Sequence, residues 1–278
     1  MFARAGDGDP EFARLAQIAR DVLLERLDGI RIRPRRILDL GSGTGATARH
    51  LARRFRGADV VSLDPVCELL HDARSRAPRW FSRHLHVTGE AERQPLSSHS
   101  MDLILSNVAM PWFDPVDLAL AECLRTLRPG GLMLLSTFGP DTLKELAFAW
   151  AGGGASPRMH SFADMHVLGD ALVHVGFADV VMDVQRIRLH TPDFWRLCRV
   201  LRRSGGSSVL AARRRGLTAV QTFRAAAARY ETLREPDGVL PVSVELVFGH
   251  AWAPASARPR STVATPRLDW SMGPESQS

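Results

Sequence analysis

The sequence predicts an α/β protein with a largely parallel β-sheet, and three observations support this. Between residues 35 and 139, short apolar segments alternate with segments of helical periodicity, which is the pattern of βαβ units. Two apolar runs, LILS at 103–106 and LMLLS at 132–136, are nearly continuous, as is typical of strands buried on both faces. The first apolar segment ends in alternating glycines, which indicates a ligand-binding turn at the edge of such a sheet.

The elements can be justified in chain order. Residues 11–28 place apolar side chains at helical spacing with charged residues between them, and therefore predict an amphipathic helix. The alternating segment then predicts strands at 37–40, 58–64, 84–88, 101–107 and 132–138, with helices at 46–55, 66–77 and 115–127.

The regular alternation of predicted strands and helices ends after residue 139. The expected elements are helices at 139–150 and 161–177, a strand at 178–190, arginine-rich helices within 193–235 and a strand at 242–248. Gly176 is the kind of residue that ends a helix. In the last strand, apolar residues alternate with others, which predicts one buried face.

The composition fits a globular protein. The chain has 278 residues, of which 45% are hydrophobic and 24% charged, which excludes a disordered chain, a collagen-like chain and a disulfide-framed mini-protein. The cysteines Cys67, Cys123 and Cys198 lie far apart, so we expect neither a disulfide framework nor a metal site. No secretory signal and no membrane span is recognisable in the sequence, and we therefore expect a cytoplasmic protein.

The charge balance is basic. Lys and Arg number 36 against 30 Asp and Glu, a net charge of 36 − 30 = +6. Lys144 is the single lysine, so the excess is carried by arginine. Biased codon usage explains such an excess. An acidic partner, such as nucleic acid, an anionic membrane or an acidic carrier protein, explains it equally well.

The glycine-rich turn, ILDLGSGTG at 37–45, is the most informative segment. Glycine allows positive φ angles and lets a ligand approach the backbone closely. Gly41, Gly43 and Ala46 satisfy the dinucleotide pattern GxGxxG/A, while Gly41, Gly43 and Gly45 satisfy the GxGxG pattern of S-adenosylmethionine sites. The glycines alone therefore leave both cofactors open.

Asp39 favours S-adenosylmethionine. This carboxylate lies within the first strand, two residues before the first glycine. It would repel the phosphates of a dinucleotide, but it suits the cationic methionine end of S-adenosylmethionine. For the same reason an NAD-dependent oxidoreductase is disfavoured.

Two further acidic residues fit a nucleoside. Asp64, followed by Pro65, ends the second strand, where a carboxylate can accept the hydrogen bonds of both ribose hydroxyls. Glu90 and the backbone amide of Ala91 follow the third strand, where they are placed to contact an adenine edge.

These segments resemble the class I S-adenosylmethionine-dependent methyltransferases over residues 35–138, together with GEAERQPLSSHSMDLILSN at 89–107 and LRTLRPGGLMLLSTF at 124–138. The resemblance implies a Rossmann-like seven-stranded sheet whose last two strands, 178–190 and 242–248, form an antiparallel hairpin. The cofactor-binding residues that we predict are Asp39, Gly41, Ser42, Gly43, Gly45, Asp64, Pro65, Glu90, Ala91 and Asn107.

The segments at 137–146, 162–172, 214–217, 240–245 and 249–254 resemble the malonyl-[acyl-carrier-protein] O-methyltransferase family of biotin synthesis. The Pro- and Ser-rich composition of residues 254–278 predicts a disordered tail. For the rest of the chain, the resemblance implies an N-terminal helical arm (1–34), a cofactor-binding half (35–139), and a part of the same domain with substrate-side helices, a helical cap insertion and the last two strands (140–253). It implies S-adenosylmethionine as cofactor, S-adenosylhomocysteine as product, and an acidic acyl carrier protein bearing a malonyl group as partner.

The implied chemistry needs no general base, because a malonyl carboxylate is already ionised at pH 7. We therefore predict no catalytic residue, and expect rate enhancement from placement in a dry site. The substrate-binding candidates are Trp112, His166, Arg213, Arg214, Arg215 and His250. Residues 196–234 contain ten arginines against the single acid Glu231, which indicates either a solvated surface or a docking surface for an acidic carrier protein.

Alternatives remain at this point. The family usually has an N-terminal aromatic lid that includes a tyrosine, whereas the only tyrosine here is Tyr230. Another class I methyltransferase, acting on a small molecule or a quinone precursor, is therefore the first alternative. The second is a non-methylating assembly factor or hydroxylase of the same fold. A nucleic-acid methyltransferase is disfavoured because SNVAMPW, and no DPPY-like string, follows the fourth strand.

Overall fold

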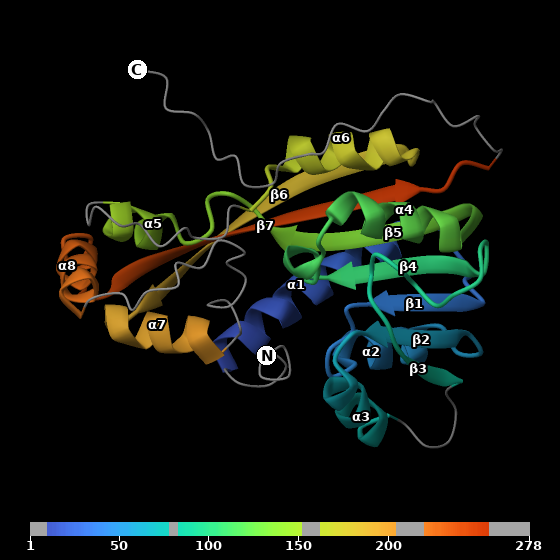
Figure 1. Ribbon diagram of the computed structural model, residues 1–278, viewed down its shortest axis with the longest axis horizontal. Helices are drawn as coiled ribbons and strands as arrows, with labels where there is room; N and C mark the ends of the chain where they lie inside the picture. Colours follow the sequence, from blue (N-terminus) through green and yellow to red (C-terminus); the bar gives the residue numbers. More distant parts are fainter. Residues whose placement is uncertain (1–9, 78–82, 152–161, 204–219, 256–278) are drawn as a thin grey trace.

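The computed structural model describes residues 10–77, 83–151, 162–203 and 220–255. A mixed seven-stranded sheet runs through it in the order β3-β2-β1-β4-β5-β7-β6 (Figure 1). The strands are β1 (Arg36–Leu40), β2 (Asp59–Asp64), β3 (His84–Thr88), β4 (Met101–Asn107), β5 (Leu127–Phe138), β6 (Ala178–Thr191) and β7 (Leu240–Trp252). The predicted α/β class and the number of strands are confirmed.

The first five strands are parallel, and β7 is antiparallel to both of its neighbours. The carboxyl ends of β1 to β5 therefore meet at one edge of the sheet, which is the edge where such folds bind ligands. The expected antiparallel pair of last strands is confirmed, although β7 is longer than the predicted segment 242–248.

Helices cover both faces of the sheet. They are α1 (Pro10–Asp28), α2 (Ala46–Arg54), α3 (Cys67–Ser75), α4 (Val116–Thr126), α5 (Lys144–Ala151), α6 (Met165–Val175), α7 (Phe194–Arg203), α8 (Val220–Glu231) and the 3₁₀ turn η2 (Met110–Trp112). Their order agrees with the predicted alternation. Helix α6 ends as expected at Gly176, whose φ angle is 113°.

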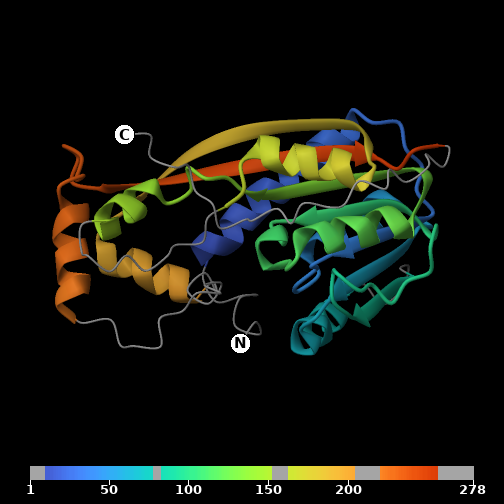
Figure 2. The ribbon, with the colours of Figure 1, turned by 45° about the horizontal axis from the view of Figure 1, so that its top comes forward.

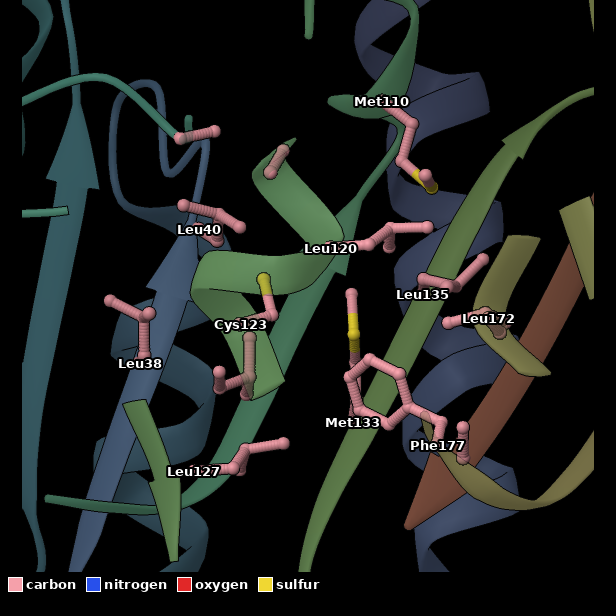
Figure 3. Close-up of a cluster of buried hydrophobic side chains, with 14 of the residues drawn as sticks. Leu38, Leu40, Met110, Leu120, Cys123, Leu127, Met133, Leu135, Leu172 and Phe177 are labelled. Carbon is pink, nitrogen blue, oxygen red and sulfur yellow. The ribbon is translucent and has the colours of Figure 1, made fainter. Parts of the chain in front are cut away.

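One layer of the core lies between the sheet and α4 and α6. Leu120 and Cys123 of α4 and Leu172 of α6 are fully buried against Leu38 and Leu135 of the strands (Figure 3). On the other face, Leu23 and Leu27 of α1 and Leu51 of α2 pack against a second set of strand residues that includes Leu103 and Phe248. Burial of these apolar side chains is the main stabilising contribution of both layers.

The prediction of one buried face for the last strand is wrong. Glu245 and Val247, expected on a polar face, are 4% and 0% exposed, and Val244 and Leu246 on the opposite face are also buried. The physical reason is position: β7 lies inside the sheet between β5 and β6, with α1 on one side and α6 on the other. The alternation of residue types in β7 therefore does not correspond to an alternation of buried and solvent-exposed side chains.

A helical cap is built on the extension of β6 and β7. Phe138 at the end of β5 pairs with Leu246, so the first part of β7 continues past the edge where the parallel strands end. Trp150, Phe194 and Tyr230, from α5, α7 and α8, pack together with Leu240 of that extension. The Tyr230 hydroxyl donates a hydrogen bond to the Pro241 carbonyl at 2.7 Å, so the single tyrosine belongs to the core of the cap. Both views place the cap beyond the carboxyl ends of β1 and β4 (Figures 1 and 2).

Several expectations lie outside the described residues, among them the break at 151–157 apart from Ala151 and the tail after residue 255. None of the described helices combines the length and the apolar character that crossing a membrane requires. Within the described ranges, no three His, Cys, Asp or Glu side chains come together as a metal centre would need.

Candidate functional site

The glycine-rich turn leads from β1 into α2, and its three glycines all have positive φ angles. A Cβ atom on Gly41 would lie 2.3 Å from the Ala109 Cβ, and one on Gly45 would lie 2.9 Å from the Ala73 Cβ. A Cβ atom on Gly43 would meet nothing within 4 Å. Gly41 and Gly45 therefore permit close packing of the turn, whereas Gly43 leaves backbone open to a ligand.

Asp39 lies beneath this turn and is 1% exposed. Its Oδ2 accepts a hydrogen bond from the Ala48 amide, in the first turn of α2, at 2.9 Å. Burial, with a smaller contribution from the nearby Asp64, raises the pKa of Asp39 to about 7 against the lowering effect of the Ala48 hydrogen bond. A cation placed beside this carboxylate would favour its ionised form.

Asp64 holds the turn to the end of β2. Its Oδ2 accepts from the Gly43 amide and its Oδ1 from the Val66 amide, both at 2.9 Å. The side chain is buried, which raises its pKa, while the two amide bonds lower it. Each carboxylate oxygen keeps a further lone pair for a ribose hydroxyl. Pro65 follows at the surface.

Ser42 supplies a test of whether a cofactor fits here. Its side chain is 9% exposed, and its buried Oγ has no hydrogen-bond partner among the described residues. Buried polar atoms are normally satisfied, so this hydroxyl calls for a polar group on a ligand. Together with open backbone at Gly43 and carboxylates at Asp39 and Asp64, it fits a cationic nucleoside such as S-adenosylmethionine.

Glu90 and Ala91 lie at the same edge. The end of β3 pairs with the end of β2, Thr88 opposite Asp64, and the Gly89 amide donates to the Asp64 carbonyl at 3.2 Å. Glu90 is exposed, whereas Ala91 packs into the apolar layer under the turn. The contact of both residues with an adenine ring stays a prediction.

Asn107 lies at the end of β4, and both polar groups of its side chain form hydrogen bonds within the protein. Its Nδ2 donates to the Ala16 carbonyl of α1, and its Oδ1 accepts from the Ser136 Oγ of β5, each at 2.9 Å. Asn107 therefore ties the N-terminal helix to the edge of the sheet. A cofactor contact through the remaining lone pair or amide hydrogen stays a prediction. The role as a tie could not be seen in the sequence, because Ala16 is 91 residues away.

Trp112 comes to the same edge through an unusual turn. Val108 has a φ angle of 53°, which is costly for a β-branched residue. The Val108 amide donates to both the Oγ and the carbonyl oxygen of Ser136 at 3.0 Å. This turn brings Ala109 against Gly41, and the Phe113 ring approaches the same glycine. Trp112 lies between these two residues in the sequence and is half-buried on η2.

The remaining substrate candidates are not gathered here. His166 is exposed in the first turn of α6. His250 pairs with Leu134, four positions or about 13 Å back from the end of β5, and its pKa is lowered by burial and then by Arg26 of α1. Arg213, Arg214 and Arg215 lie outside the described residues.

Sequence reasoning missed the buried Glu245. Its Oε2 accepts from the Asp141 amide at 3.0 Å and its Oε1 pairs with Arg186 at 3.1 Å. A Cβ atom on Gly139 would lie 2.4 Å from its Oε2. Glu245 thus fixes the chain that leaves β5 for the cap. An acid inside an otherwise apolar strand was the available signal.

Comparison with known proteins agrees with this geometry. Residues 38–135 match the family described as a methyltransferase domain. A protein of Laribacter hongkongensis is 42% identical over 259 residues, covering 90% of this chain and 86% of that protein, and one of Gallionella capsiferriformans is 39% identical, covering 91% and 89%. Both are named malonyl-[acyl-carrier protein] O-methyltransferase. The chain belongs to the malonyl-[acyl-carrier protein] O-methyltransferase family.

As a member of this family, the protein is an S-adenosylmethionine-dependent methyltransferase. The predicted family, enzyme class and cofactor are thereby confirmed. The YcgJ protein from Bacillus subtilis, with a TM-score of 0.59 at 15% identity, covers 86% of this chain and 99% of its own. That likeness concerns the fold alone, and it confirms the predicted Rossmann-like seven-stranded sheet.

Proposed function

We propose that this protein methylates the free carboxylate of a malonyl group carried as a thioester by an acyl carrier protein, a step of early biotin synthesis. The observation that carries the proposal is the extent of the relationship. The relatives match about nine-tenths of the chain, well beyond the cofactor half at 38–135. The likeness therefore includes the cap, which lies on the acceptor side of the sheet edge.

Bound S-adenosylmethionine supplies a methyl group on a positively charged sulfur. In our proposal, Asp39 neutralises the cationic methionine end and Asp64 accepts the ribose hydroxyl hydrogen bonds. The open backbone at Gly43 and the Ser42 hydroxyl approach the polar end of the cofactor, and Gly41 and Gly45 shape the turn. We assign the contacts with the adenine to Pro65, Glu90 and Ala91. Asn107 holds α1 over the edge of the sheet.

The acceptor needs positioning rather than proton removal. A malonyl carboxylate is ionised at neutral pH, so its oxygen forms the new bond to the methyl carbon as the carbon–sulfur bond breaks, and no proton moves. Two opposite charges are neutralised in this step, so exclusion of water favours it. This is why we assign no general base. Trp112 is the residue we assign to the acceptor pocket, because η2 lies against the glycine-rich turn.

His166, His250, Arg213, Arg214 and Arg215 remain predictions for the acceptor side. The net charge of +6 and the arginines of 196–234 support a carrier protein that is acidic. We place the reaction in the cytoplasm, on the ground that the dispersed cysteines are free, as is usual in a reducing compartment.

The test is incubation of the purified protein with malonyl-acyl carrier protein and isotopically labelled S-adenosylmethionine. The expected result is a labelled methyl ester, seen by mass spectrometry as one added methyl group that base hydrolysis removes. Rescue of a biotin-requiring strain is the test in cells. Methylation of a small molecule or quinone precursor, with none of the malonyl carrier, would replace this proposal by the first alternative. Cofactor binding without methyl transfer to any carboxylate would favour the non-methylating alternative.

A further inference from the structure

Helix α7 presents a strongly basic face to solvent. Its buried side consists of Phe194 and Leu197, which pack into the cap. The exposed side carries Arg196, Arg199, Arg202 and Arg203 together with Trp195. The nearest acid in the sequence, Asp193, is half-buried and accepts the Arg196 amide at 2.7 Å. The outward face of the helix is thus cationic along its length.

The charges of three of these arginines are not neutralised by the described part of the chain. Arg199, Arg202 and Arg203 form no ion pair with any residue that the structure describes. Arginines elsewhere do have acidic partners: Arg125 pairs with Glu122, and Arg234 pairs with Glu231. An exposed row of unpaired cations is a surface that attracts an acidic partner.

Trp195 adds an apolar contact to the basic face. Its side chain is 44% exposed. The ring is held by Phe194, edge-on with 5.4 Å between ring centres, and by Phe223, nearly parallel at 6.3 Å. A supported, exposed tryptophan beside arginines has the composition of an interface anchor.

The position of α7 suits a partner protein that brings the methyl acceptor to the site. The helix follows the end of β6, where Thr191 pairs with Leu240, beyond the level at which Phe138 ends β5. Figures 1 and 2 both show α7 on the cap, on the side toward which the parallel strands point. A partner bound to α7 would lie on the side of the sheet toward which its glycine-rich turn faces.

We propose that the exposed face of α7, formed by Trp195, Arg196, Arg199, Arg202 and Arg203, docks an acidic surface of the acyl carrier protein. This inference rests on the proposed function and adds the surface that recognises the carrier. Carboxylates of the partner pair with the arginines, and an apolar side chain of the partner covers Trp195. Attraction between the two surfaces raises the association rate and depends on ionic strength.

The test compares two substrates that carry the same malonyl thioester. The double variant Arg199→Glu, Arg202→Glu is assayed with malonyl-acyl carrier protein and with malonyl-pantetheine, which has no protein part and no phosphate. We expect KM for the carrier substrate to rise about tenfold at low salt, with kcat and the malonyl-pantetheine rate unchanged. Trp195→Ala should raise the same KM independently of salt.

A matched control and three outcomes make the test decisive. Arg53 and Arg56 are exposed at the end of α2, away from the carboxyl edge, and the variant Arg53→Glu, Arg56→Glu should leave both substrates unaffected. An unchanged carrier KM in the α7 variant overturns the inference. Loss of binding to duplex DNA or RNA with an unchanged carrier KM assigns the face to nucleic acid and also overturns it. If the parent protein methylates neither thioester, the proposed function itself fails.

Discussion

Replacement of Asp39 by asparagine should separate folding stability from cofactor binding. The folded state raises the pKa of Asp39 from 3.8 to about 7 because the carboxyl group is buried. A folded-state pKa above the unfolded value means that the native protein prefers the protonated form. The stability that the protonated carboxyl contributes is therefore complete below pH 4 and is lost as the pH rises to about 7.

The magnitude follows from the shift. About three pKa units at 1.36 kcal/mol each amount to about 4 kcal/mol for ionisation of Asp39 in the folded state. About two of those units lie between pH 5 and pH 7. Asparagine keeps an oxygen for the Ala48 amide and cannot ionise. As the pH rises from 5 to 8, the free energy of unfolding of the parent protein should therefore fall by about 3 kcal/mol relative to that of Asp39→Asn.

Denaturant unfolding at both pH values, with and without S-adenosylmethionine, measures this. A cofactor at 100 times its Kd stabilises the parent protein by about 2.7 kcal/mol, whereas Asp39→Asn should show almost no gain. Asp170→Asn, an exposed position on α6, is the control and should follow the parent protein at both pH values. Parallel pH dependence of Asp39→Asn and the parent, or equal stabilisation by the cofactor, would refute the reasoning.

Three further predictions concern the same edge of the sheet. The affinity for S-adenosylmethionine should increase as the pH rises to about 7, because the cation binds the ionised form of Asp39, and calorimetry in two buffers should detect proton release; a flat pH profile would contradict this. Gly43→Ala should weaken cofactor binding at least tenfold but cost only about 1–2 kcal/mol of stability through its positive φ angle, whereas Gly41→Ala, which also collides with Ala109, should cost clearly more in urea unfolding; equal stability losses would be inconsistent with the open position of Gly43. Asn107→Ala should destabilise the protein by about 1–3 kcal/mol, because its partners lose their hydrogen bonds, and should speed proteolysis within α1; unchanged protection of α1 would show that the tie is unimportant.

The architecture of the first half could be predicted because each strand and helix there carries its own periodicity. The location of the glycines, Asp39 and Asp64 at one edge of the sheet could also be predicted, since they lie in or directly after two strands whose carboxyl ends meet. The two-sided burial of β7 could not, because it depends on which strands flank it. Glu245 illustrates the difference: its burial comes from packing between strands that are distant in sequence.

Contacts between distant segments account for the rest. Asn107 was predicted as a cofactor contact from its place after β4, but its hydrogen bonds to Ala16 and Ser136 depend on how α1 crosses the sheet. The arginine-rich sequence at 196–234 predicted positive charge, but not which arginines share one exposed face. Only the packing of Phe194 and Leu197 into the cap determines which arginines of α7 face outward.

The long pairing of β6 and β7 has a mechanical consequence. The two strands are paired from Ala178–Trp252 to Thr191–Leu240, with one irregularity of register between Ala178 and Val181. The same ribbon therefore lines the core at one end and carries the helices of the cap at the other. A hinge made of loose loop is absent along this described ribbon. Displacement of α7 by a bound protein would therefore bend the ribbon itself, and the strain would reach the Phe138–Leu246 pair at the end of β5.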